Sequence, residues 1–161
     1  MFKQLGFLSL VLCFVTSCII APPMSAPQRR ALQTKTFDET SYDNVFKAFK
    51  NVLQDEGYII KNQDYNGGMI LATILKADNT SEWFAQMDGK QNYRTGEGFE
   101  VSVSFDRINK KATETRLTIQ KVEQYSMGGT KGYEILDPKM YKSLYDKITV
   151  EIERRKAKGM S

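Results

Sequence analysis

The side chains of this sequence that could take part in covalent chemistry are few. The 161 residues include two cysteines, Cys13 and Cys18, and no histidine. Without histidine the chain can form neither a His-activated nucleophile nor a His-ligated metal site. Asp55 and Glu56 are adjacent carboxylates, but neighbouring helical residues point in different directions, so these two do not converge as an acid–base pair. We therefore expect a protein that is not an enzyme, and we predict no metal or other cofactor.

Cys18 ends a segment that has the composition of a signal peptide. Lys3 supplies a positive charge, and the apolar run at 5–15 is about 11 residues long, whereas a membrane-spanning helix needs about 20. The run ends in Val15-Thr16-Ser17-Cys18, where a branched apolar residue and two small residues precede the cysteine. This ending resembles a lipobox, the signal for joining a diacylglyceryl group to the cysteine thiol, cleaving the chain before the cysteine and acylating the new amine. We predict that residues 1–17 are removed as a signal peptide and that Cys18 carries the lipid.

Two alternatives to this processing are weaker. Ordinary signal cleavage after Ala26 would place the bulky Met24 where a small residue is needed. A retained membrane helix is disfavoured because the polar residues Thr16 and Ser17 end the apolar run. Residue 19 is isoleucine; an aspartate there resembles the inner-membrane retention signal of Gram-negative bacteria, so its absence favours the outer membrane and its periplasmic face. Three acyl chains would hold the protein stably at that membrane.

Proline content separates the predicted anchor from the predicted domain. Residues 19–30 contain three of the four prolines in the chain, so we predict that residues 18–30 form a lipidated tether. Extended as polyproline, this tether would reach about 35 Å at about 3.1 Å per residue. Residues 31–159 are long enough to form a single domain with its own hydrophobic core.

Two helices are expected from the spacing of apolar residues. In the first, predicted over 42–56, four residues share one helical face: Val45, Phe49, Val52 and Leu53. Gly57 suits the left-handed position that follows a helix. Asp137 and Pro138, a capping acid and a first-turn proline, predict the start of the second helix. Its buried face is expected to contain Tyr141, Leu144, Ile148 and Ile152.

The remaining patterns predict strands. A first strand is expected at 31–39, and residues 65–68, with the sequence Tyr-Asn-Gly-Gly, predict a turn between two more. The clearest alternation places four apolar residues on one face: Phe99, Val101, Val103 and Phe105. The next strand presents Thr115, Leu117 and Ile119, and 126–132 is expected to be a glycine-rich loop. The order β-α-β-β-β-β-α predicts an α+β fold, with an antiparallel sheet of four to five strands and two helices on one face.

The polar stretch at 78–98 is the segment that most suggests a partner-binding surface. It has no clear period, and a loop of this length in a compact domain is usually functional or disordered. It contains Trp83, Phe84, Tyr93 and Arg94, which are residue types that often anchor protein interfaces. The same residues could instead cover one end of the core or extend the adjoining hairpin.

The charge of the chain gives little reason to expect a nucleic-acid partner. Its formal net charge is +4, from 23 basic and 19 acidic residues, and such a mild balance is typical of a mixed, solvated surface. Four basic residues gather near the C-terminus: Arg154, Arg155, Lys156 and Lys158. They could contact anionic lipid or a partner, although a basic last turn is also what the helix dipole favours.

Three segments resemble the landmarks of a group of small, largely uncharacterised proteobacterial outer-membrane lipoproteins. They are 33–37, 52–58 and 137–141, which mark a strand start, a helix end and a helix cap. The similarity extends over 31–155, nearly the whole predicted domain. The element order is also similar to that of the helix-grip domains of the C lipoprotein of the outer-membrane β-barrel assembly machinery. The resemblance implies an envelope lipoprotein with a helix-grip-like domain, and it supplies no catalytic or binding residues.

Two functions fit these features. The first is a membrane-anchored periplasmic lipoprotein that binds another envelope protein as an accessory or scaffold. It is favoured by the long tether, the compact domain and the lack of a catalytic constellation. The alternative is a small-ligand or lipid-binding module that uses a cleft between helix and sheet.

The predicted anchor is tested by substitution of Cys18. Cells that express the full chain with labelled palmitate should incorporate the label, and Cys18→Ala should abolish incorporation because the acceptor thiol is lost. The substitution Cys13→Ala is the control, since Cys13 lies in the segment predicted to be removed. Equal labelling of the Cys18→Ala chain would contradict the prediction.

Overall fold

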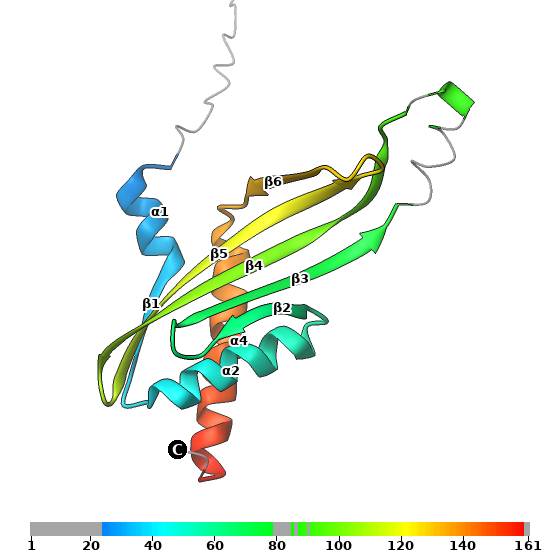
Figure 1. The fold of residues 1–161 in the computed structure, drawn as a ribbon. Coiled ribbons are helices and arrows are strands. Elements are labelled where there is room, and N and C mark those ends of the chain that lie inside the picture. The colour runs from blue at the N-terminus through cyan, green and yellow to red at the C-terminus, as the bar shows by residue number, and fades with distance from the viewer. Residues whose placement is uncertain (1–23, 79–84, 86, 90, 160–161) are drawn as a thin grey trace, which may run out of the picture.

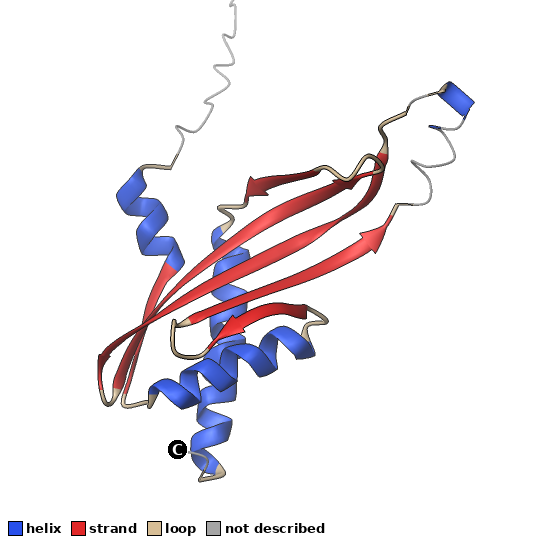
Figure 2. Cartoon of the chain, viewed as in Figure 1, coloured by secondary structure: helices blue, strands red, loops and turns tan. Residues whose placement is uncertain are grey.

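The computed structural model describes residues 24–78, 85, 87–89 and 91–159. Within them the fold is α+β, with three helices and one antiparallel sheet of six strands (Figures 1 and 2). Along the chain the elements are α1 (Ala26–Gln33), β1 (Thr34–Asp38), α2 (Tyr42–Asp55), β2 (Ile59–Asp64), β3 (Met69–Ala77), β4 (Arg94–Asn109), β5 (Ala112–Tyr125), β6 (Thr130–Glu134) and α4 (Pro138–Ala157).

The sheet is organised around the long hairpin of β4 and β5. Its strand order is β1-β5-β4-β3-β2, and β6 also pairs with β5. Two short strands share the outer side of β5, because β1 pairs with 112–116 and β6 pairs with 120–124. On the other side of the hairpin β3 pairs with β4 over its whole length, whereas β2 reaches only as far as Thr73 of β3.

Both long helices begin where the sequence places a capping residue. The Ser41 hydroxyl accepts a hydrogen bond from the Asn44 backbone N–H at the start of α2, at 3.4 Å. The Asp137 carboxylate accepts one from the Lys139 N–H at 2.9 Å, and Pro138 occupies the first turn of α4. Such caps satisfy backbone donors that have no partner within the helix. The predicted starts of both helices are therefore confirmed.

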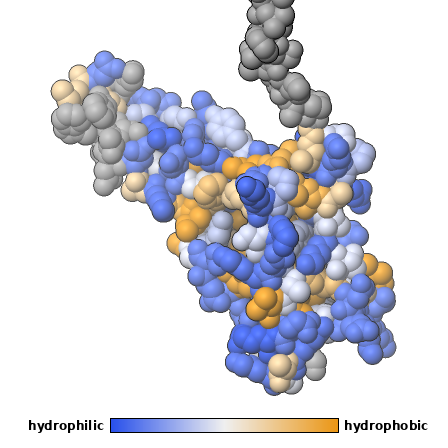
Figure 3. Space-filling view, turned by 180° about the vertical axis from the view of Figure 1, so that it is seen from behind, coloured by the Kyte–Doolittle hydropathy of each residue, from blue (hydrophilic) through white to orange (hydrophobic). Residues whose placement is uncertain are grey.

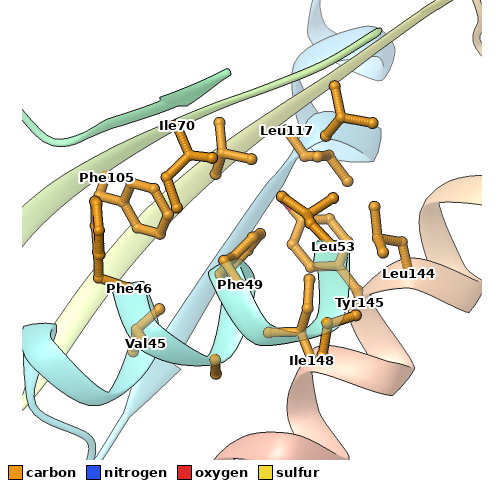
Figure 4. Packing of buried hydrophobic residues seen from close by; sticks show 14 of the residues in the cluster. Val45, Phe46, Phe49, Leu53, Ile70, Phe105, Leu117, Leu144, Tyr145 and Ile148 are labelled. Atoms are coloured by element: carbon orange, nitrogen blue, oxygen red, sulfur yellow. The ribbon is translucent and has the colours of Figure 1, made fainter. Parts of the chain in front are cut away.

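One hydrophobic core lies between these helices and the part of the sheet that they cover. Figure 4 shows Phe49 and Leu53 of α2 between sheet residues and Ile148 of α4. The core strands contribute alternate residues, so the core lies on a single face of the sheet: Ile70 and Ala72 of β3, Val101, Val103 and Phe105 of β4, and Leu117 and Ile119 of β5. The expected inner faces of β4 and β5 and the expected stripe of α4 are confirmed.

Tyr145 of α4 links this helix to the junction of α1 and β1 inside the core. Its hydroxyl donates a hydrogen bond of 2.6 Å to the Gln33 carbonyl, at the junction of α1 and β1. Burial raises the pKa of the Tyr145 hydroxyl to about 12, so the group stays protonated and able to donate at neutral pH. Its ring packs against the rings of Phe37 and Phe49, both with centroids 6.3 Å away.

The N-terminal part of the fold differs from the sequence-based expectation. Residues 26–30, predicted as extended tether, form α1 together with Ala31–Gln33, which were predicted as strand. Ser25 caps this helix, and its N–H donates to the Gln28 side chain at 2.9 Å. Arg29 then pairs with Glu134 at 3.2 Å, so the helix is fastened to the end of β6. The first strand consequently begins at Thr34.

The strand and helix counts also differ from the prediction. The sheet has six strands, not four to five, because Thr130–Glu134 extends the sheet as β6 where a loop over 126–132 was expected. The described part of the chain has a third helix, α1, besides the two predicted. Residues 94–98 belong to β4, so the polar stretch at 78–98 is shorter as a loop than the sequence suggested. No helix among the described residues combines the length and apolarity needed to cross a membrane.

A substitution in the middle of the core tests this packing. Phe49 is fully buried, and its ring lies 5.0 Å from that of Phe105. Replacing it with alanine should lower the free energy of unfolding by about 3–5 kcal/mol, since the cavity cannot collapse between two helices and a sheet. Urea unfolding measures the change. Val150→Ala, at a position that is 68% exposed on α4, is the control and should shift stability by less than about 0.5 kcal/mol. Equal effects of the two substitutions would contradict the assigned core.

Candidate functional site

The sheet extends beyond the helices, and a cleft lies where the two separate. One hollow, of about 520 Å³, is lined by Glu56, Tyr58, Ile74, Lys76, Glu97, Gly98, Phe99, Lys121 and Ile135. A second, of about 290 Å³, also contains Glu56 and Tyr58 and continues along the first turns of α4 past Lys139, Met140 and Leu144. We call these adjoining hollows the helix–sheet cleft. Figure 3 shows the molecule from behind, with hydrophobic residues in separate patches among hydrophilic ones.

The apolar lining of the cleft continues the buried face of the sheet. Ile74 of β3 and Phe99 of β4 lie directly opposite each other in the strand register and follow the same alternation as the core residues. Ile135 follows β6, and its N–H donates to the Ile119 carbonyl at 2.8 Å, which fixes it beside β5. These three side chains lie where the core would continue if the helices were longer.

Tyr58 is placed at the junction of the two hollows by the end of α2. Gly57 adopts a φ of +86°, a left-handed conformation that favours glycine, and it turns the chain from the helix toward β2. The Tyr58 N–H then donates to the Leu53 carbonyl at 2.9 Å. Burial raises the pKa of the Tyr58 hydroxyl, and the nearby Glu56 carboxylate raises it further. At neutral pH the cleft therefore presents a protonated phenol that can donate a hydrogen bond.

Ion pairs occupy the same face of the sheet beyond the apolar lining. Lys121 lies 3.0 Å from Glu97, and this hydrogen bond is the main reason that the pKa of Glu97 is lowered and the pKa of Lys121 is raised. Arg94 contacts Asp78 at 2.8 Å, Glu97 at 3.0 Å and Glu123 at 3.6 Å. The hydrogen bond with Asp78 is the largest cause that raises the pKa of Arg94. These opposite charges pair with one another beside the cleft.

Two lysines at the cleft have no such compensation. Among the described residues neither Lys76 nor Lys139 has an acidic partner, whereas Lys147 pairs with Glu56 and Lys121 with Glu97. The cleft lining has four lysines and two glutamates, and Lys76 lies directly opposite Glu97, which Lys121 and Arg94 also contact. An apolar group with an anionic neighbour would complement this lining.

The carboxylates of the cleft are engaged in ion pairs. Its two carboxylates, Glu56 and Glu97, are each held by a lysine, and they lie on different sides of the first hollow's apolar lining. In the part of the chain that the structure describes, no group of three or more His, Cys, Asp or Glu side chains is placed to hold a metal ion. The cleft offers apolar side chains, a phenol and ammonium groups as contacts for a ligand or partner.

The residues that the sequence marked for partner binding fall into two groups. Trp83 and Phe84 lie outside the described residues, as does the predicted lipid-bearing Cys18. Tyr93 and Arg94 are adjacent at the start of β4, and the Tyr93 N–H donates to the Ser126 hydroxyl at 3.2 Å. Arg94 belongs to the ion-pair group beside the cleft, through its contact with Glu97. The role of these four residues in partner binding stays a prediction.

The C-terminal basic cluster is largely engaged within the fold. Arg155 is buried, and its guanidinium donates to the Asn44 side chain of α2 at 3.1 Å. Arg154 forms a bidentate pair with Glu151, and this hydrogen bonding lowers the pKa of Glu151. Lys156 pairs with Glu153 at 3.0 Å. Arg155 thus helps to pack α4 against α2.

The cleft residues Tyr58, Lys76 and Ile135 were not marked by the sequence. The sequence does mark the place where the apolar face of the sheet ends, because Phe99 and Ile119 are the last apolar inner residues of β4 and β5 and the charged residues Glu97 and Lys121 lie next to them.

No protein-family model matches the chain, and no curated protein matches it.

At Gly98 the strands β3 and β4 lie so close together that an added methyl group would clash with β3. A Cβ atom at Gly98 would lie 1.8 Å from the carbonyl oxygen of Ile74. Gly98→Ala should therefore spread β3 from β4 and lower the free energy of unfolding by about 1–3 kcal/mol, as overpacking does. Urea unfolding gives the magnitude, and amide chemical shifts show whether Ile74 moves. Gly129→Ala is the matched control, because its added Cβ would meet nothing within 4 Å. A stable Gly98→Ala protein with unchanged Ile74 signals would contradict this geometry.

Proposed function

We propose that this protein is a lipid-anchored component of the bacterial envelope that binds another envelope protein through the helix–sheet cleft, as an accessory or scaffold. The observation that carries the proposal is the exposed sheet beyond the helices, which has an apolar lining next to charged residues. Protein interfaces combine an apolar centre with a polar rim in this way, and aromatic side chains such as Tyr58 and Phe99 are frequent anchors.

The anchor in this proposal is Cys18. The lipobox-like sequence at 15–18 and the short apolar run before it support lipidation, and Ile19 supports the outer membrane with the domain on the periplasmic side. We also propose that the domain is helix-grip-like and related to the proteobacterial lipoproteins that the sequence resembles. The long helix α4, packed on one face of an antiparallel sheet, supports that architecture.

A second candidate is favoured by the size of the cleft. Its larger hollow, about 520 Å³, lies within the range of about 300–1,000 Å³ that is usual for small-ligand sites. A lipid or other amphiphile with an anionic group would match its apolar lining and its unpaired lysines. Native mass spectrometry of the protein purified from cells separates the candidates, because a bound small molecule adds far less mass than a bound protein does.

Photo-crosslinking in cells tests protein binding at the cleft. A photoreactive amino acid replaces Tyr133 or Lys139, which are exposed beside the cleft on β6 and α4. Both positions should give a crosslinked product with the same second protein. Ser104 is the control, since it is exposed on β4 and alternates with the buried Val103 and Phe105. If the cleft positions gave no product, or the same products as Ser104, the proposed binding surface would be wrong.

A further inference from the structure

The edge of β3 next to the cleft has no partner strand. β2 begins at Ile59, opposite Thr73, and the chain before it turns back toward α2 at Gly57. β3 continues for four residues past that point, from Ile74 to Ala77. Within the described part of the chain, no strand pairs with these residues on the β2 side. Tyr58 falls opposite Ile74 in this register, so the position of β2 in the sheet is unfilled from Leu75 to Ala77.

The backbone orientation at this edge follows from the close approach of β4. The Ile74 carbonyl oxygen lies against Gly98, and the Lys76 carbonyl oxygen lies 3.1 Å from where a Cβ on Gly96 would be, so both residues direct their backbone groups at β4. Successive residues of a strand alternate in this respect. Leu75 and Ala77 therefore direct their N–H and C=O groups away from β4, toward the unfilled position.

We propose that an extended segment of the partner protein adds to this edge as a further strand, continuing the line of β2. The inference rests on the proposed protein-binding function and specifies how the partner is held. Leu75 and Ala77 offer two donors and two acceptors to the added backbone, which is the mode of recognition known as β-strand addition. Because exposed edges readily pair with other chains, natural proteins usually cover, shorten or charge them.

The side chains around the edge define the chemistry of the segment. In a sheet, residues directly opposite each other on one face have Cβ atoms about 4.5–5.5 Å apart. Tyr58 falls opposite Ile74 when the register of Ile59 and Thr73 is continued, so the added segment would begin opposite Leu75. The side chain opposite Lys76 would face an ammonium group whose neighbour in β4, Glu97, is already contacted by Arg94 and Lys121. The expected segment is an extended peptide with an acidic residue opposite Lys76.

Peptide binding to the full lipidated chain in detergent micelles tests this proposal. The probe is a capped seven-residue peptide of alternating threonine and valine in which one valine is replaced with glutamate. It should bind at least tenfold more tightly than the same peptide with lysine instead of glutamate, measured by fluorescence anisotropy. Methylation of all its backbone amides should remove the binding, and NMR should show shifts of the Leu75 and Ala77 amides. Equal binding of the methylated peptide, or unmoved Leu75 and Ala77 signals, would overturn the proposal.

Variants of the chain make the test specific to this edge. Leu75→Pro removes an N–H that the sheet does not use and should abolish peptide binding. Thr130→Pro is the matched control on the edge of β6, because Ile135 directs its N–H at β5 and the alternation places Thr130 outward. Lys76→Glu leaves the backbone intact, so it remains informative where a proline variant fails to fold, and it should reverse the preference in favour of the lysine peptide. An unchanged preference would refute the role of Lys76.

Two further outcomes separate this inference from its alternatives. If the chain alone sediments as a dimer that Leu75→Pro dissociates, the edge pairs with a second copy and the partner segment is ruled out. If crosslinks from Tyr133 and Lys139 persist in cells that express Leu75→Pro, the partner binds at the cleft without strand addition. In that case the proposed function stands and this inference is refuted.

Discussion

The β4–β5 hairpin is longer than any helix that packs against it, and most features of this molecule depend on that difference. A strand of 16 residues such as β4 extends about 50 Å, whereas α4, with 20 residues, extends about 30 Å and α2, with 14, about 20 Å. The apolar face of the sheet can be buried only where a helix covers it. Beyond that limit the inner face of β5 changes from Leu117 and Ile119 to Lys121 and Glu123. The change of residue type marks the end of the core, and the cleft lies at this boundary.

The covered half is held by hydrogen bonds between parts of the chain that are far apart in sequence as well as by its aromatic core. The Gln33 side chain donates to Glu134 at 2.7 Å, and its oxygen accepts hydrogen bonds from Arg116 at 3.1 and 3.2 Å. Gln33 is fully buried, so satisfying its amide matters, because an unpaired buried polar group costs roughly 1–3 kcal/mol. Together with the Tyr145 hydroxyl, these contacts tie α1, β5, β6 and α4 at one point. These contacts hold the covered part of the sheet against the helices, and the uncovered part continues from it as the same strands.

Sequence patterns predicted the elements whose signal is local. The 3–4 residue spacing around Phe49, the cap at Asp137 and the alternation from Phe99 to Phe105 each identify an element without knowledge of its neighbours. The elements that were missed depend on distant contacts. α1 is polar and contains Pro27, and it is fixed by the pairing of Arg29 with Glu134. β6 is exposed along its whole length and gains its register only by pairing with β5. A cleft between helix and sheet was an alternative from the sequence, but its lining residues were not predicted, since they come from α2, the sheet and α4 together.

The docking of α1 changes how far the domain can stand from a lipid anchor. With Ser25 capping a helix that is fastened to β6, only the seven peptide units between Cys18 and Ser25 remain to span the distance, which is roughly 25 Å at full extension. If Cys18 carries the proposed lipid, this length limits the distance between the membrane and the start of α1. The domain could still turn about its attachment. Insertions before Ser25, more than changes in the folded domain, would set which partners lie within range.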